Sequence, residues 1–177
     1  MARWMSAPFF ALYVVKQLRA SNLILGYTYA AIALTMSLTS VLFGKKIDRH
    51  HYVFSDLRKW LMFALLIAGF TQWGLALTTQ SSALFIFGAF WGVSLGLILI
   101  TLFSLLLKET ARQSHSRSLG LGNTALKLGN LLGIVAGTLI QSMGNFFSSF
   151  MVIGCFYFLL ASLTGFFQRT HPIRSYS

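Results

Sequence analysis

Five long apolar runs dominate the hydrophobic pattern of this 177-residue chain. Each is close to the length of about 20 residues that an α-helix needs to cross the hydrocarbon core of a membrane. None contains Asp or Glu. Backbone groups in lipid must be hydrogen-bonded within their own segment, so we expect every run to be a helix. The predicted spans are residues 22–43, 60–78, 83–107, 119–141 and 146–167.

A sixth apolar run, residues 4–15, is too short to cross a membrane alone. We expect it to be the last part of a span whose beginning is missing. The segments between the other runs alternate between strongly basic and uncharged. Residues 44–59, residues 108–118 and the C-terminal tail together hold ten of the fourteen Lys and Arg residues. The positive-inside rule therefore predicts that 44–59 and 108–118 are cytoplasmic loops and that the C-terminus is cytoplasmic.

The composition fits an integral membrane protein, with 56% hydrophobic and only 10% charged residues. Soluble domains carry about 25% charged residues. The net charge of +11 raises the question of nucleic-acid binding, but the basic residues lie in short clusters between apolar runs. No zinc-finger spacing or RNA-binding motif is present. The predicted fold class is an all-α polytopic membrane helix bundle that forms one domain over residues 1–177. We expect it to contact membrane lipid and not to bind nucleic acid.

The sequence offers little for catalysis. Its three acidic residues all lie at or beyond the ends of the predicted spans, and no CxxC, HExxH or GxSxG motif occurs. The adjacent His50 and His51 lack a nearby Cys or carboxylate that would complete a metal site, and solvated loop residues are the simpler interpretation. We therefore expect neither enzymatic activity nor a bound metal or cofactor.

Lys127 is the one charged residue deep within a predicted span. It lies nine residues past Ser118, which is about 13 Å along a helix. Asn123, Lys127 and Asn130 are spaced four and three apart, so they are expected to share one helix face. An intramembrane charge is a functional-site candidate, and these three residues are our candidate substrate pathway. The alternative is that Lys127 extends to the cytoplasmic surface or lies neutral in a wet cavity.

Glycine is regularly spaced in the same span. Gly129, Gly133 and Gly137 follow each other at intervals of four residues. Small residues at this spacing let two membrane helices approach closely. We therefore predict a helix-packing ridge at these three positions.

The first basic segment has a recognisable order of residues. Gly44, Asp48 and Arg49, followed by the pair Arg58 and Lys59 between two spans, resemble the loop signature of the major facilitator superfamily. In that family the signature joins the second and third spans of each six-helix half, which is its position here. The second basic group follows Asp48 by ten residues instead of about four, so this loop looks expanded.

The resemblance extends over nearly the whole chain. Gly92 and Gly96 lie four apart in the fourth span, Glu109 and a basic loop ending at Arg117 follow, and the fifth span is rich in glycine. The fourth span has no early Arg, with Gly88 near that position, and the fifth has no Gly-Pro pair. Both departures favour a carboxy-terminal half of the family's fold.

The resemblance implies a secondary transporter, or a fragment or half of one, that moves a small solute by alternating access of two six-helix halves. It also implies a cytoplasmic gate at Gly44, Asp48 and Arg49. The simpler alternative is that Asp48 only balances the Lys and Arg residues near it. The implied partners are a small solute, a proton as candidate coupling ion, and a second half or a second copy of this chain.

The alternative function is a non-transporting membrane protein, either an accessory subunit or an inactive remnant of a transporter gene. Five full spans and one partial span cannot enclose a two-sided pathway alone. A chain found alone in the membrane, without a second copy or a second half, would therefore favour this alternative. The expected location under either function is a plasma membrane, the inner membrane of a bacterium, crossed several times.

Overall fold

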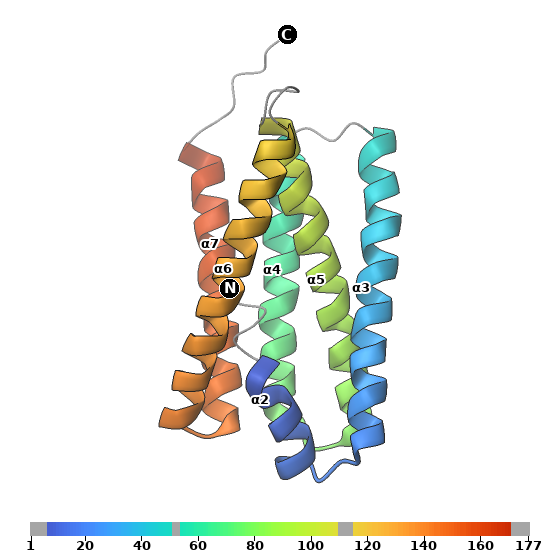
Figure 1. The fold of residues 1–177 in the computed structure, drawn as a ribbon, viewed down its shortest axis with the longest axis vertical. Helices are drawn as coiled ribbons and strands as arrows, with labels where there is room; N and C mark the ends of the chain where they lie inside the picture. The colour runs from blue at the N-terminus through green and yellow to red at the C-terminus, as the bar shows by residue number, and fades with distance from the viewer. Residues whose placement is uncertain (1–6, 51–53, 110–114, 171–177) are drawn as a thin grey trace.

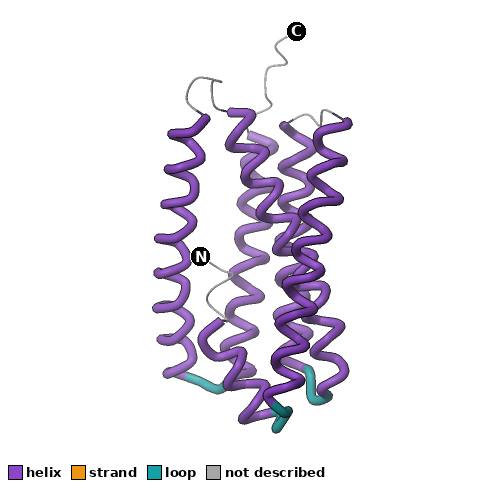
Figure 2. Tube along the Cα trace, turned by 45° about the vertical axis from the view of Figure 1, so that its right-hand side comes forward, coloured by secondary structure: helices purple, strands orange, loops and turns teal. Residues whose placement is uncertain are grey.

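The computed structural model describes residues 7–50, 54–109 and 115–170, and these residues are helical except for short turns. A short first segment consists of α2 (Ala7–Leu12) and the π-helical η1 (Tyr13–Gln17). Five long helices run side by side along the molecule (Figures 1 and 2). They are α3 (Asn22–His50), α4 (Phe54–Leu77), α5 (Ser81–Glu109), α6 (His115–Met143) and α7 (Phe146–Thr170).

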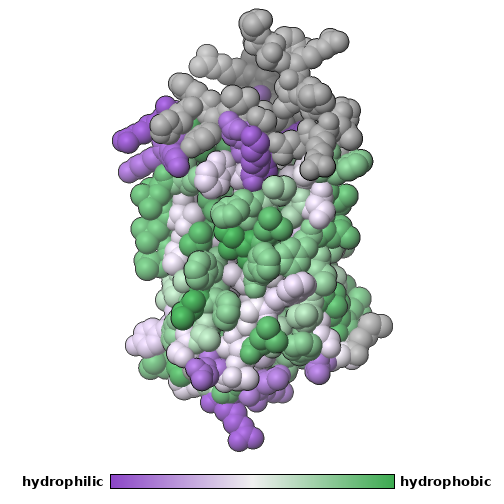
Figure 3. Space-filling model, turned by 180° about the vertical axis from the view of Figure 1, so that it is seen from behind, coloured by the Kyte–Doolittle hydropathy of each residue, from purple (hydrophilic) through white to green (hydrophobic). Residues whose placement is uncertain are grey.

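The all-α polytopic bundle predicted from the sequence is confirmed. Each of the five long helices is long and apolar enough to cross a membrane. A broad hydrophobic belt separates two hydrophilic ends of the molecule in Figure 3. We call the end where α3 stops and α4 starts the basic end. Its described residues include Lys45, Lys46, Arg49, Arg58 and Lys59.

The helices at the basic end are longer than the predicted spans. Helix α3 continues to His50 and α4 begins at Phe54, so most of segment 44–59 is helical and not a loop. The count of apolar residues locates the hydrocarbon core but not the helix end, because charged residues outside the core continue the helical hydrogen bonds. Gly44 is itself helical, and no described glycine has a positive φ, so it forms no left-handed cap.

Four of the long helices form a continuous row. Helix α5 packs along α3 on one side and along α4 on the other, and α4 also packs along α7. Helix α6 runs in front of this row in Figure 1 and contacts α2, α5 and α7 more sparsely. As a result α3 and α6 are the least covered of the five membrane-crossing helices.

The contact between α3 and α5 depends on small residues of α5. A Cβ atom built on Gly92 would lie within 2.5 Å of the Ile32 carbonyl oxygen and still closer to Thr35 Oγ1. One built on Gly96 would lie 2.7 Å from the Met36 carbonyl oxygen. The two helices therefore approach each other to a distance that only glycine permits at these positions.

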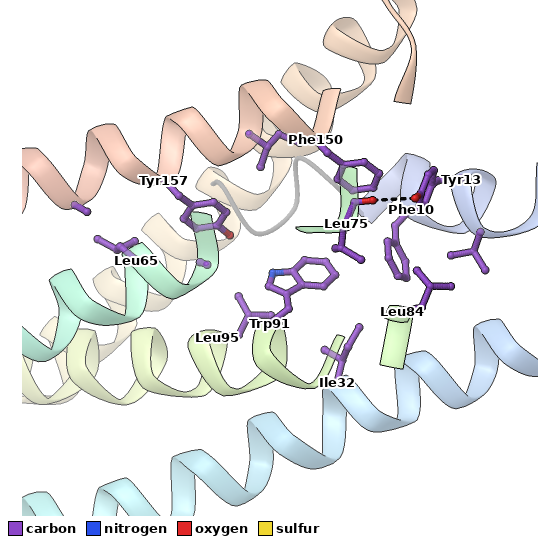
Figure 4. Close-up of a cluster of buried hydrophobic side chains, with 14 of the residues drawn as sticks. Phe10, Tyr13, Ile32, Leu65, Leu75, Leu84, Trp91, Leu95, Phe150 and Tyr157 are labelled. Atoms are coloured by element: carbon purple, nitrogen blue, oxygen red, sulfur yellow. Dashed lines mark hydrogen bonds between the residues drawn. The ribbon is translucent and has the colours of Figure 1, made fainter. Parts of the chain in front are cut away.

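Aromatic side chains fill the core where the first segment meets the bundle (Figure 4). Phe10 packs against Trp91 of α5, with ring centroids 5.7 Å apart, and Tyr13 packs edge-on against Phe150 of α7 at 5.0 Å. All four side chains are buried. The first segment is thus held against two helices that lie far from it in the sequence.

The Tyr13 hydroxyl also fixes the first segment to α4. It lies 2.8 Å from the Leu75 carbonyl oxygen and 2.7 Å from the Thr78 carbonyl oxygen. These carbonyls lie at the C-terminal end of α4 and just beyond it, and that of Leu75 also accepts the Thr78 backbone N–H at 3.3 Å. The single hydroxyl proton is donated to one of them at a time, and so a side chain from η1 closes the end of α4.

Candidate functional site

The three polar residues predicted to line a pathway all lie on α6, but they do not face the same space. Asn123 and Lys127 are exposed on the surface of the bundle, whereas Asn130 is half-buried. The Asn130 Oδ1 atom is fully buried and has no hydrogen-bond partner in the described part of the protein. Residues spaced four and three apart share one side of a helix but do not point in the same direction. Asn130 lies at the edge of this side and faces the interior of the bundle.

A cavity of about 310 Å³ lies beside Asn130, between α4, α5, α6 and α7. Leu126, one turn before Asn130, lines the same cavity, but Asn123 and Lys127 do not. Most of the wall is leucine, and its polar side chains are Asn130, Tyr157 and Thr164. The Thr164 hydroxyl is already used, since it donates to the Leu160 carbonyl oxygen at 2.8 Å. The cavity is therefore a mainly apolar space, with the buried amide oxygen of Asn130 and the hydroxyl of the buried Tyr157 in its wall.

Two further polar groups are buried in the bundle, outside the lining of this cavity. Gln72 of α4 is completely buried, and neither of its amide atoms has a hydrogen-bond partner in the described protein. The indole nitrogen of Trp91 is also buried without a hydrogen-bond partner in the described protein, one helical turn from Leu95 in the cavity wall. Trp73, in contrast, donates to the Met151 carbonyl oxygen of α7 at 3.2 Å.

The candidate gate residues are on the last turns of α3. Asp48 and Arg49 are both exposed, and no ion pair of Asp48 lies within the described residues. Gly44 is half-buried, and a Cβ built on it would make an ordinary contact of 3.5 Å with Ile100 of α5. Asp48 and Arg49 are thus available to groups outside this bundle.

Other residues hold α3 to α4 at the basic end. Phe43 and Trp60 pack edge to face with ring centroids 4.8 Å apart, and the Lys46 ammonium lies 5.6 Å from the centre of the Trp60 ring. Ile47 and Leu57 are buried beneath them. Sequence reasoning missed this cluster because charge at a helix end was interpreted as solvated. The detectable signal was an aromatic pair at the ends of two spans that the chain joins closely.

We expect Lys46→Met to lower the free energy of unfolding by about 0.5–1 kcal/mol, the usual value of an exposed cation–π contact. The ammonium loses its place over the electron-rich Trp60 ring, while the methionine keeps much of the aliphatic packing. Unfolding of the purified chain in mixed micelles would measure the change. Lys45→Met, an exposed neighbour outside this contact, is the control. If the two substitutions changed the free energy of unfolding equally, the Lys46–Trp60 contact would not stabilise the fold.

The predicted glycine ridge on α6 lies on the covered side of that helix. Gly133 and Gly137 are buried and Gly129 is half-buried. Helix α6 meets α2 along part of its length. The closest approaches of a glycine to the backbone of another helix that the structure gives are on α5, at Gly92 and Gly96.

Comparison with known protein families decides the identity of this bundle. The model of the Major Facilitator Superfamily matches residues 1–176, which is almost the whole chain. The chain belongs to the major facilitator superfamily. No curated protein and no solved structure gave a significant match.

Membership in the major facilitator superfamily agrees with the architecture described above. Superfamily proteins are multi-pass membrane transporters and not enzymes, and the five membrane-crossing helices make this chain a multi-pass integral membrane protein. The match fits either six-helix half of the superfamily fold, so the carboxy-terminal assignment stays a prediction.

Proposed function

We propose that this chain is one half of a secondary transporter that moves a small solute across the membrane by alternating access. Asn123 and Lys127 line the solute pathway on the exposed surface of α6, and Asn130 lies at the buried edge of that pathway. Gly44, Asp48 and Arg49 form the gate, on the cytoplasmic side of a plasma membrane. A second six-helix half, or a second copy of this chain, completes the pathway, and a proton is the candidate coupling ion.

The observation that carries this proposal is the exposed Lys127 within a membrane-crossing helix. It lies eight residues inside the apolar segment Leu119–Ser142, on the uncovered surface of the bundle. A lysine facing lipid at such depth costs about 2.5–3.5 kcal/mol on insertion scales. A partner or a water-filled path removes this cost, and Asn123, also exposed, continues the polar surface one turn away.

The exposure of α3 and α6 supports the need for a second half. These two helices are only 11% buried over their apolar windows, whereas α4 and α5 reach 39% and 44%. In an assembly of two halves, the uncovered faces provide the surface that the partner packs against. The exposed Asp48 and Arg49 then pair with charges of that partner in one of the two states.

The proposal can be tested without knowledge of the solute, by the reaction of introduced cysteines with a maleimide that cannot cross membranes. The native Cys155 is exposed on α7 and is first replaced by serine. In native membranes, Lys127→Cys and Asn123→Cys are expected to react roughly tenfold faster than Leu128→Cys, because thiols react only where water allows ionisation. Leu128 is the matched control, since it is 58% exposed on the same helix.

Reaction of Lys127→Cys from both sides of the membrane is the result expected of alternating access. Labelling from one side only would indicate a fixed opening and count against a rocking transporter. If Lys127→Cys reacted as slowly as Leu128→Cys, no water path would reach this face of α6. The chain would then be better explained as a non-transporting accessory protein or an inactive remnant of a transporter.

A further inference from the structure

The cavity beside Asn130 lies between four helices of this half and is partly enclosed by them. Its walls come from four helices, with Leu61 and Leu65 on α4, Leu95 and Leu99 on α5, and Leu160 on α7. Figure 4 shows Leu65, Leu95 and Tyr157 of this wall from within the bundle. Its volume of about 310 Å³ reaches the lower end of the range known for small-molecule sites.

The chemistry of the wall offers ordered water few partners. A buried water molecule needs two to four polar partners, and an apolar cavity without them stays dry. Here leucines form most of the surface, the Thr164 hydroxyl is bonded to its own helix, and the only other polar side chains among the described residues of the wall are Asn130 and Tyr157. The Asn130 Oδ1 atom is left as a buried acceptor without a protein donor. Such an atom gains more from a hydrogen bond than an exposed one, since no water competes for it.

We propose that this cavity binds a small apolar molecule that donates one hydrogen bond to Asn130 Oδ1. The leucine wall selects a compact hydrocarbon or aromatic body, and the amide oxygen selects a molecule with an N–H or O–H group at one edge. A molecule of bicyclic aromatic size fits the volume, whereas a phospholipid does not. A charged ligand is disfavoured because no ionisable group of opposite charge lines the space.

Three bicyclic probes of nearly the same shape test this directly. Indole carries an N–H donor, benzofuran carries only an acceptor oxygen, and indene carries neither. Binding of each radiolabelled probe to the purified full chain in detergent is measured by equilibrium dialysis. The micelle also takes up the probes, so specific binding is the difference from a Leu99→Trp variant, in which a larger side chain fills the cavity.

Indole is expected to bind roughly five- to tenfold more tightly than indene or benzofuran, which corresponds to one buried hydrogen bond. Asn130→Leu keeps the side-chain size and removes the acceptor, so the three probes should then bind alike. Asn22→Leu is the control: it makes the same change at an exposed position of α3, away from the cavity wall, and should leave the preference for indole intact. Comparison of these two variants does not depend on whether Leu99→Trp folds.

Equal binding of the three probes to the unaltered chain, tighter binding of benzofuran, or a preference for indole that survives Asn130→Leu would each overturn the inference. So would the absence of binding for all three. The inference depends on the cavity and not on transport. If the chain selects indole through Asn130 but Lys127→Cys does not react with the maleimide, the binding site is supported and the proposed transport function is not. If Lys127→Cys reacts but indole is not selected, the transport function is supported and the binding site is not.

Discussion

Replacing Gly92 by alanine should lower the free energy of unfolding by about 3 kcal/mol, at the upper end of the usual penalty for overpacking. The added methyl group would lie 2.5 Å from the Ile32 carbonyl oxygen and 3.1 Å from its Cα atom. Real Cβ atoms do not approach backbone this closely, and a backbone atom cannot rotate away as a side chain can. The two helices would have to separate, and the contact between α3 and α5 would loosen along its length.

Gly26→Ala is the matched control, because Gly26 lies on α3 with no atom within 4 Å of a Cβ built there. Alanine is favoured over glycine within a helix by about 0.5–1 kcal/mol, so this variant should be unchanged or slightly more stable. Reversible unfolding of both variants in mixed micelles gives the two free energies. If Gly92→Ala proved as harmless as Gly26→Ala, the close approach of α3 and α5 would be wrong.

Replacing Gln72 by leucine should stabilise the protein, by about 2 kcal/mol. Gln72 is completely buried on α4, and neither amide atom has a hydrogen-bond partner in the described protein. An unsatisfied buried polar group carries a desolvation penalty of about 1–3 kcal/mol. Leucine has a similar size and no polar atom, so it removes the penalty and retains the packing of α4.

The control for this substitution is Gln141→Leu, where the same change has the opposite expected sign. Gln141 Oε1 accepts a hydrogen bond of 2.8 Å from the Ser149 hydroxyl, which links α6 to α7. Its loss should cost about 1 kcal/mol. Both variants are compared by the same unfolding measurement. A clear loss of stability in Gln72→Leu would contradict the prediction, since it would mean that the amide makes a favourable contact in the membrane.

The sequence was sufficient for the number and approximate position of the membrane helices, because each apolar run is long and free of acids. It was not sufficient for the ends of α3 and α4. Residues 44–50 include four charged side chains but are helical. Hydropathy detects the residues that favour lipid, not backbone hydrogen bonding. Which glycines pack closely also required the structure, since the spacing of four residues occurs on both α5 and α6 and does not name the partner helix.

The candidate site was predicted only in part. The sequence identified the polar positions on α6, but helical spacing alone could not tell that Asn130 turns toward a cavity while Lys127 stays exposed. That difference depends on where α4, α5 and α7 pack against α6. The Lys46–Trp60 contact was missed for the same reason, because it joins two helices whose relative rotation the sequence does not specify.

The contacts of Tyr13 have a consequence for the order in which the protein assembles. The Leu75 carbonyl that accepts its hydroxyl lies 62 positions later in the chain, and Phe150 is later still. Synthesis proceeds from the N-terminus, so the first segment leaves the ribosome long before its partners exist. A nascent chain that ends after α5 could offer Leu75 but not the ring of Phe150. This segment is made before α3 to α7 but is therefore among the last of these elements to reach its final place in the membrane.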